Sequence, residues 1–341
     1  NGRAARLELR RAEVDAVRSV ETLIAELGVD VERHSVGETC LAHRPREMLE
    51  FEAEAARIHE NYGVTPALVS RQDLRAQGMS GPFHGAMTIP IGFGLNPAKL
   101  LQGLLEAAMR AGVQCFDNSA ATRIDGSHVV TRSGTVQADR VVLATNGYSS
   151  EDVPSWMTAR YMPAQSTVLV TRPITAAEQQ AQGWTTDQMA YDTRKLLHYF
   201  RLMPIGRFLF GMRGGVFSSV RAEMRARRRV LRDFRRMFPA WQSVEVTHSW
   251  SGMVCLARNM LPFAGAVPQA PHLLAGFAYH GNGVAMGTHV GQVLADLALG
   301  RSPDSYPDVL RDPARRFPFG PWRRSIMPPL YGAFSLSDLK P

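Results

Sequence analysis

Cysteine is scarce in this sequence, and its placement excludes the common cysteine-based sites. Only Cys40, Cys115 and Cys255 occur among 341 residues, and no two of them have a CxxC spacing. An odd number of widely separated cysteines is typical of neither a disulfide framework nor a zinc site. We therefore expect no metal site, and the reduced thiols favour a cytoplasmic location.

Long apolar runs are also missing. Every apolar stretch is interrupted by glycine, proline or a charged residue, well before the roughly 20 residues that a membrane-spanning helix needs. The chain opens on Asn1, Gly2 and Arg3, without an initiator methionine or the apolar segment of a signal peptide. These features predict no membrane span, and the first residues indicate a processed or truncated chain.

The residues that are present have an ordinary globular composition. With 45% hydrophobic and 21% charged residues, the disordered and fibrous classes are excluded. The net charge of +8 indicates either an anionic partner or a basic surface that aids solubility. Much of this charge lies at 221–236, where apolar residues recur at a helical spacing without aromatic residues placed to stack on bases. We expect a solvated helix face there and no nucleic-acid partner, with a basic interaction helix as the alternative.

Apolar spacing predicts alternating helices and strands, as in an α/β protein. The predicted helices are residues 6–27, 47–62, 97–111, 176–182, 221–238 and 284–299. The predicted strands are residues 113–116, 161–171, two antiparallel strands within 196–213, 244–251 and 273–277, with hairpins over 29–43 and 129–146. The second arm of the latter hairpin contains VVLA at 141–144, which is typical of a strand covered on both faces.

Two glycine-containing turns follow predicted strands. Residues 276–287 (GFAYHGNGVAMG) lead from an apolar strand through Gly281, Asn282 and Gly283 into a helix. Glycines allow a cofactor to approach the backbone, and the free N–H groups of a helix N-terminus favour an electron-rich group. Residues 145–147 (TNG) follow the other strand, where ligands of open α/β sheets bind. Because neither segment is a GxGxxG motif, a turn without a ligand is the alternative.

Three segments in this order resemble the family of D-amino-acid oxidase-like flavoproteins, which includes sarcosine, glycine and γ-glutamylputrescine oxidases. They are residues 141–148 (VVLATNGY), the strand pair within 199–213, and residues 250–285 with WSG, LPFAG and HGNGVA. The resemblance extends over about residues 1–335 and is nearest to the γ-glutamylputrescine oxidase-like branch.

The resemblance implies an α/β fold in which an FAD-binding, Rossmann-like domain is interleaved with a mostly antiparallel substrate domain. The implied FAD-binding domain is incomplete and consists of residues 1–30, 92–150 and 250–300. The implied substrate domain comprises residues 31–91 and 151–249, and residues 301–341 would form a C-terminal surface tail.

The implied activity is oxidation of a C–N bond in an amine or amino acid. Hydride would pass to flavin N5, the imine would hydrolyse, and oxygen or another acceptor would take up the electrons. FAD would be bound non-covalently. Some members of the family attach the flavin through cysteine, but the offset of Cys255 from Leu261 and Pro262 does not match, so we expect Cys255 to be a buried thiol.

The resemblance also assigns site residues. Those implied to contact FAD are Thr145, Asn146, Gly147, Gly281, Asn282, Gly283 and Val284. Those implied to face the substrate are Tyr199, Arg201 and His280. The guanidinium of Arg201 would hold a carboxylate in a two-pronged geometry. Core packing of Tyr199 and a solvated Arg201 are the alternatives.

One family feature is missing from the start of the sequence. The family opens with a strand, a GxGxxG turn and a helix that bind the FAD pyrophosphate, and residues 1–60 contain no such unit. We therefore expect this chain on its own to bind FAD weakly, if at all. Two alternatives remain open: a non-catalytic remnant without cofactor, and a basic interaction protein acting through residues 221–236.

Overall fold

The computed structural model describes residues 2–215 and 219–339, and the chain divides into two compact units. The first unit consists of residues 1–31, 96–164 and 253–325. The second unit consists of residues 32–95, 165–252 and 326–341. Each unit is therefore assembled from segments that are far apart in the sequence.

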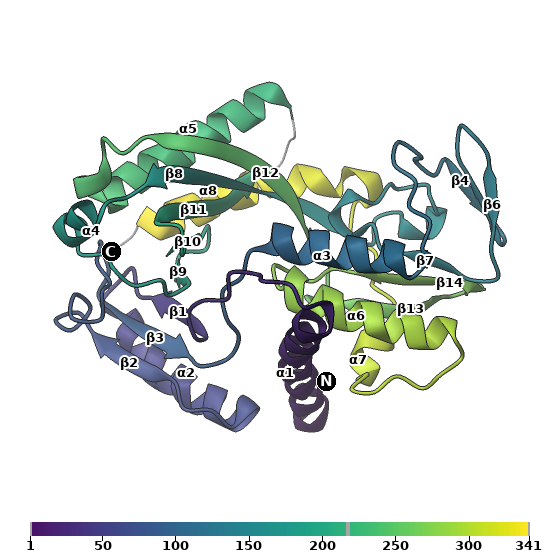
Figure 1. The fold of residues 1–341 in the computed structure, drawn as a ribbon, viewed down its shortest axis with the longest axis horizontal. Helices are drawn as coiled ribbons and strands as arrows, with labels where there is room; N and C mark the ends of the chain where they lie inside the picture. The colour runs from purple at the N-terminus through teal and green to yellow at the C-terminus, as the bar shows by residue number, and fades with distance from the viewer. Residues whose placement is uncertain (1, 216–218, 340–341) are drawn as a thin grey trace. The chain divides into compact units, whose positions relative to one another are not determined.

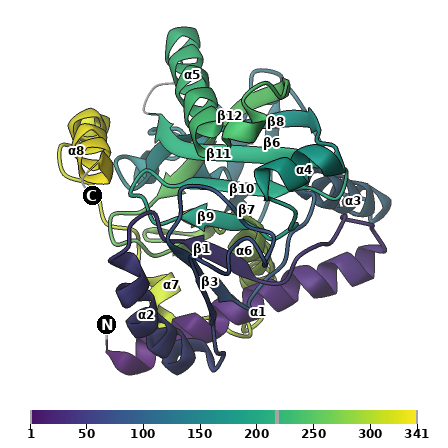
Figure 2. The same ribbon diagram turned by 90° about the vertical axis from the view of Figure 1, so that its left-hand side faces the viewer.

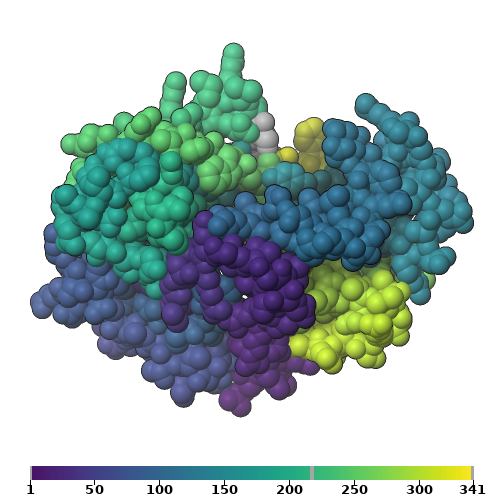
Figure 3. All heavy atoms as spheres, viewed as in Figure 1, coloured from purple at the N-terminus to yellow at the C-terminus, as the bar shows by residue number. Residues whose placement is uncertain are grey.

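The first unit contains a three-stranded sheet, and α6 (Gly283–Ala298) and α7 (Asp308–Arg311) pack against it. The strand order is β13 (Phe263–Val267), β14 (Ala270–Phe277) and β7 (Val141–Leu143). β14 is antiparallel to β13 and parallel to β7. The unit also contains α1 (Arg3–Leu27) and α3 (Pro97–Arg110). α6 packs on β14 and α1 on α6 (Figure 1), and α1 and α3 are side by side in Figure 3.

The local sequence explains where two of these helices begin and end. Gly28 adopts the left-handed conformation, with φ of 62°, and ends α1. The side chain of Asn96 accepts hydrogen bonds from the N–H groups of Ala98 and Lys99 at 3.1 and 3.4 Å, and thereby caps α3. Both boundaries agree with the helices predicted from the sequence.

A small separate sheet corrects the hairpin predicted over residues 129–146. β5 (His128–Val130) pairs with β4 (Arg123–Asp125) and with β6 (Thr135–Gln137), whereas β7 pairs with the distant β14. The prediction that both faces of residues 141–144 are covered is also wrong, because Val142 is 46% exposed. In the part of the chain that the structure describes, β7 is an edge strand whose neighbour is β14.

The second unit is built on an eight-stranded sheet. The strand order is β12 (Val246–Leu256), β8 (Met162–Pro173), β11 (Arg207–Gly215), β10 (His198–Leu202), β9 (Ala190–Asp192), β1 (Glu38–Leu41), β3 (Gly85–Ile89) and β2 (Ala67–Ser70). β1 is parallel to β9 and antiparallel to β3. The boundaries between the two units fall within β8 and β12.

One face of this sheet carries a cluster that we call the aromatic core. It consists of Trp184, Phe200, Phe208, Phe210, Phe234, Phe238 and Trp241. Neighbouring rings are 4.9 to 6.1 Å apart between centroids. α5 (Val220–Met237) contributes Phe234 to the core, and Tyr331 and Phe334 of α8 (Met327–Leu339) pack against it. Trp241 Nε1 of the core donates to the carbonyl of Glu178 on α4 (Ala176–Gln182). At the β1 end, α2 (Glu47–Tyr62) covers the opposite face through Phe51 and Ile58.

Two further sequence expectations differ from the structure. Residues 29–43 do not form a hairpin, since β1 pairs with β3 and β9 and only an isolated bridge joins His34 to Gly94. Residues 113–116 are not a strand. In both segments, the short apolar pattern carries no information about which distant strand is available for pairing.

The segment 301–341, expected as a surface tail, is shared between the units. Residues up to 325 belong to the first unit, where Leu310 and Arg323 are buried, and residues from 326 onward belong to the second. None of the described helices is both long and apolar enough to cross a membrane.

Candidate functional site

The two glycine-containing turns of the first unit meet at one edge of its sheet. β7 and β14 are parallel, with Leu143 opposite Ala275, so their carboxyl ends lie at the same edge. The side-chain oxygen of Asn146 accepts a hydrogen bond of 3.0 Å from the N–H of Ala278. The structure therefore links the TNG turn directly to the segment that leads into α6.

The TNG turn is fixed by a close approach of two backbone segments. A Cβ atom on Gly147 would lie 2.9 Å from the carbonyl oxygen of Met253. The N–H of Met253 donates to the hydroxyl of Tyr148 at 3.2 Å. Thr145 is exposed, and its hydroxyl lies 2.7 Å from that of Ser149. Only glycine fits at position 147 without a backbone shift.

The turn into α6 exposes the N-terminus of that helix. His280 and Gly281 have positive φ angles of 54° and 117°, which reverse the chain after β14. The first intrahelical hydrogen bond runs from the N–H of Met286 to the carbonyl of Asn282, and the Asn282 side chain does not cap the helix. Residues 281–284 are exposed, so the N–H groups that precede this bond can serve an external acceptor.

His280 is tied to the residues that end and follow β12. Its N–H donates to the carbonyl of Cys255 at 3.3 Å, and the N–H of Ala257 lies 3.5 Å from its Nε2. Cys255 is 1% exposed, and burial raises the pKa of its thiol to about 12. This thiol is therefore protonated at neutral pH and is a poor nucleophile.

Tyr199 and Arg201 belong to the second unit, on the face of β10 opposite the aromatic core. The Tyr199 hydroxyl lies 2.8 Å from Ser166 Oγ. Its ring lies over Gly211, its partner on β11, where an added Cβ would come within 2.2 Å of the ring. Burial raises the pKa of Tyr199. The absence of a side chain at Gly211 thus sets the position of the tyrosine ring.

The guanidinium of Arg201 contacts only uncharged groups among the described residues. Nη2 donates to the carbonyl of Leu95 at 3.1 Å, and Nη1 lies 3.5 Å from the sulfur of Met189. The buried Nε has no hydrogen-bond partner in the described part of the chain. Burial lowers the pKa of Arg201, and the more distant charge of Glu32 opposes this shift.

Two further residues on this face, Tyr191 and Glu38, were not predicted from the sequence. Tyr191 of β9 lies opposite Tyr199 in the antiparallel pair, and its hydroxyl is 3.5 Å from a carboxylate oxygen of Glu38 on β1. β9 and β1 are only three and four residues long. The alternation of apolar and polar residues in them is too short to predict a strand from the sequence.

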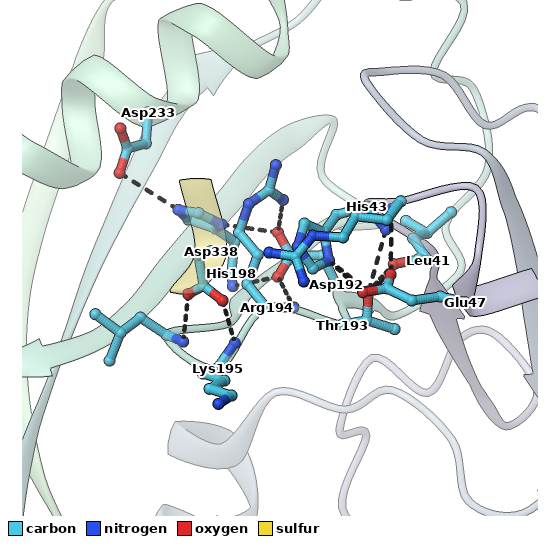
Figure 4. Close-up of polar contacts among 12 residues, drawn as sticks. Leu41, His43, Glu47, Asp192, Thr193, Arg194, Lys195, His198, Asp233 and Asp338 are labelled. Atoms are coloured by element: carbon cyan, nitrogen blue, oxygen red, sulfur yellow. Dashed lines mark hydrogen bonds and ion pairs between the residues drawn. The ribbon is translucent and has the colours of Figure 1, made fainter. Parts of the chain in front are cut away.

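A buried network of charged residues holds the loop between β9 and β10 (Figure 4). Asp192 accepts hydrogen bonds from Arg194 and from His198 Nδ1, the latter at 2.8 Å. His198 Nε2 lies 3.4 Å from Asp233 on α5. Burial alone lowers the pKa of His198, but its hydrogen bonds to the two aspartates outweigh burial and raise it. The network thereby fixes the strands that carry Tyr191, Tyr199 and Arg201.

The same loop is anchored on its other side by α2 and α8 (Figure 4). His43 Nδ1 lies 2.8 Å from Thr193 Oγ1 and 3.0 Å from Glu47. Burial lowers the pKa of His43, and the neighbouring carboxylate of Glu47 opposes this shift. Asp338 of α8 accepts hydrogen bonds from the N–H groups of Lys195 and of the next residue at 3.0 and 3.1 Å.

A hollow of about 900 Å³ lies elsewhere in the first unit, between α1, α6 and residues 299–307. None of the site residues predicted from the sequence lines it. The described residues also contain no group of three or more His, Cys, Asp or Glu side chains arranged to bind a metal ion.

The structure thus groups the predicted site residues in two sets. The seven residues assigned to FAD, together with His280, belong to the first unit, and Tyr199 and Arg201 belong to the second. Within the first unit, the Asn146–Ala278 hydrogen bond joins the two FAD segments. Within the second, Tyr199 and Arg201 point from the same face of one strand.

Parallel strands that end in a glycine turn and a helix N-terminus are typical of α/β proteins that bind a nucleotide cofactor. The chain belongs to the DAO family, described as FAD dependent oxidoreductase, which matches residues 2–297. The family resemblance inferred from the sequence is confirmed.

Two curated relatives show the extent of the match. The probable oxidoreductase OrdL of Rhizobium meliloti (strain 1021) is 28% identical over 294 residues, which are 84% of this chain and 66% of the relative. The gamma-glutamylputrescine oxidoreductase of Escherichia coli (strain K12) is 27% identical over 246 residues, which are 71% of this chain and 56% of the relative. The chain therefore spans 56% to 66% of the length of these two relatives.

Solved structures show the same fold. Glycine oxidase from Geobacillus kaustophilus has a TM-score of 0.73 at 18% identity, covering 90% of this chain and 82% of that chain. Iminodiacetate oxidase (IdaA) from Chelativorans sp. BNC1 has a TM-score of 0.70 at 18% identity, covering 85% and 80%. The mixed α/β fold predicted from the sequence is confirmed.

Proposed function

We propose that this chain forms part of an FAD-dependent oxidoreductase that oxidises a C–N bond of an amine or amino acid. The observation that carries the proposal is the pairing of two turns at one sheet edge, joined by the hydrogen bond between Asn146 and Ala278. Relatives named for γ-glutamylputrescine and for glycine support an amine or amino-acid substrate.

The residues at this edge fit the cofactor. Residues 281–284 are exposed, and a Cβ added to Gly283 would meet no atom closer than 4.0 Å, which leaves the backbone open to approach. Residues 145–147 and 281–284 would hold FAD, which would supply an acceptor for the hydride of the carbon that bears the amine. The N-terminus of α6 would stabilise the negative charge that collects near flavin N1. Because Cys255 is buried and protonated, we assign non-covalent binding.

The first unit would hold FAD and the second unit the substrate. Arg201 would bind a substrate carboxylate, since its guanidinium contacts no negative group among the described residues. Tyr199, with its raised pKa, would remain protonated and act as a hydrogen-bonding group rather than a base. We also assign His280, which its backbone N–H holds at the turn before α6, to contact with the substrate.

The test compares the 341-residue chain with a version extended by about 80 upstream residues, the usual place of the strand–GxGxxG–helix unit. We expect the shorter chain to bind FAD weakly and the extended chain to bind it tightly and to oxidise an amine from a panel of polyamines and amino acids. FAD binding is measured by flavin fluorescence and turnover by substrate-dependent oxygen or dye consumption. Tight FAD binding without turnover of any amine would refute the proposed reaction.

A non-catalytic remnant that holds no cofactor is the second candidate. A ligand at 100 times its Kd stabilises the native state by about 2.7 kcal/mol. A thermal midpoint that FAD raises in neither version would support the remnant, and an FAD-dependent rise in the extended version would exclude it.

A further inference from the structure

Helix α5 presents five exposed arginines along one side. Arg221, Arg225, Arg228, Arg232 and Arg235 follow one another at intervals of four, three, four and three residues, and all are exposed. At 3.6 residues per turn these positions fall within about 80° around the helix axis. We call this set the arginine stripe. The opposite side of the helix packs Val230, Phe234 and Met237 into the aromatic core.

Acidic residues of α5 leave four of the five stripe arginines without an ion pair among the described residues. Glu223 lies on another side of the helix, and Asp233 is buried against His198 with Arg232 Nε 3.4 Å away. The other four stripe arginines form no ion pair among the described residues. Like charges at three- and four-residue spacing destabilise a helix. A solvated surface helix usually carries charges of both signs. The positive charge of the arginine stripe is therefore complementary to an anionic surface outside the chain.

α8 adds exposed apolar side chains beside α5. Arg229 of α5 donates to the hydroxyl of Ser335 on α8 at 3.1 Å. Both helices belong to the second unit, and Figure 2 draws α5 in green and α8 in yellow. Tyr331 and Phe334 of α8 face the aromatic core, while Leu336 is 67% and Leu330 38% exposed. Cationic and apolar groups therefore occur on neighbouring helices of one unit.

This combination indicates a lipid surface rather than a nucleic acid. Basic side chains bind anionic headgroups, and adjacent apolar side chains reach the acyl boundary. Sequence-tolerant binding of single-stranded nucleic acid uses aromatic platforms for the bases, and the residues between the stripe arginines include no exposed aromatic side chain. We propose that the arginine stripe and the exposed leucines of α8 bind the surface of an anionic lipid bilayer.

The test is sedimentation of the 341-residue chain with phosphatidylglycerol–phosphatidylcholine vesicles and with pure phosphatidylcholine vesicles. We expect binding to the anionic vesicles alone, and weaker binding as salt rises. The triple variant R221Q/R225Q/R228Q should bind about 100-fold more weakly, because each basic residue contributes about fivefold, or about 1 kcal/mol. Leu336→Ser should weaken binding without a change of charge.

The matched control is R123Q/R132Q/R140Q, which removes the same charge from exposed positions of the first unit. Circular dichroism and the thermal midpoint verify that each variant is folded. The proposal is overturned if anionic vesicles do not bind, or if both triple variants lose equal affinity, which would indicate attraction by net charge. It is also overturned if a duplex oligonucleotide binds more tightly than the vesicles and loses affinity in the stripe variant.

Discussion

Arg201 of β10 is largely buried and makes no anionic contact within the part of the chain that the structure describes. Among the described residues, the guanidinium of Arg201 contacts the backbone carbonyl of Leu95 and the sulfur of Met189. Its Nε has no hydrogen-bond partner there. An ionised group in such surroundings is costly unless a counter-charge compensates it. A substrate carboxylate would supply that charge, which is why we assign Arg201 to substrate binding.

Replacement of Arg201 tests this role. In the extended protein, Arg201→Gln should lower kcat/KM for an amino acid by about 100-fold, since loss of a charged partner costs about 2 to 5 kcal/mol. An amine without a carboxylate should be affected less than about threefold. Steady-state kinetics with both substrates measure the difference, and Arg132→Gln is the exposed control. Equal losses for the two substrates would show that Arg201 is structural.

Gly147 sets the position of the TNG turn through sterics alone. Gly147→Ala places a Cβ 2.9 Å from the Met253 carbonyl oxygen, so one backbone must move, at a cost of about 1 to 3 kcal/mol. Gly291→Ala in α6 is the matched control, because a Cβ added at Gly291 would lie within 4 Å of no neighbouring group. That change should stabilise the chain by about 0.5 to 1 kcal/mol. Urea unfolding measures both effects, and similar values for the two variants would contradict the steric argument.

At the scale of elements, charged residues join strands and helices that the apolar cores alone would not position. The two ring nitrogens of His198 on β10 form hydrogen bonds with two carboxylates, those of Asp192 on β9 and Asp233 on α5. The pKa values of both aspartates are lowered despite their burial, because His198 and nearby arginines favour the charged carboxylates. The aspartates therefore stabilise the fold above their ordinary pKa of 3.8, and this stability is lost as the pH falls through their lowered values.

His198 gives the network a pH dependence of opposite sign. Its pKa is raised above the ordinary value of 6.5, so its contribution is complete below pH 6.5 and is lost as the pH rises through the raised value. The difference in unfolding free energy between the wild type and His198→Gln should therefore be larger at pH 6 than at pH 9. Urea titrations across this range measure it. The exposed control His128→Gln should stay within about 0.5 kcal/mol of the wild type, and a constant difference for His198→Gln would contradict the assigned charge.

At the scale of the whole molecule, cofactor binding and folding are linked, because a ligand that binds the native chain also stabilises it. The exposed N-terminus of α6 belongs both to the fold and to the proposed FAD site. A negatively charged side chain at this N-terminus would stabilise the helix through its dipole, but it would also repel an electron-rich ligand at the same place.

Val284→Asp separates these two effects in the extended protein. Without FAD, the variant should be about 0.3 to 1 kcal/mol more stable than the neutral control Val284→Asn. Its FAD affinity should be lower by about fivefold or more. Thermal midpoints and flavin fluorescence give the two values. Unchanged FAD affinity would mean that this helix end does not face the cofactor.

The sequence by itself determined the long helices and the family. Apolar spacing is local, so the pattern over residues 6–27 or 284–299 reports a buried helix face wherever that helix packs. Gly28 and Asn96 mark helix ends by their own conformational preferences. The family motifs likewise depend on residue order alone.

Only the tertiary structure decided which strands pair and which charged groups meet. β7 pairs with β14 across more than a hundred residues, and β1 pairs with β3 and β9, where the sequence indicated local hairpins. Tyr191, Glu38 and the His198 network became visible only with those pairings. A strand's own sequence sets its alternation but not its partner, because the partner is chosen by packing and hydrogen bonding between distant segments.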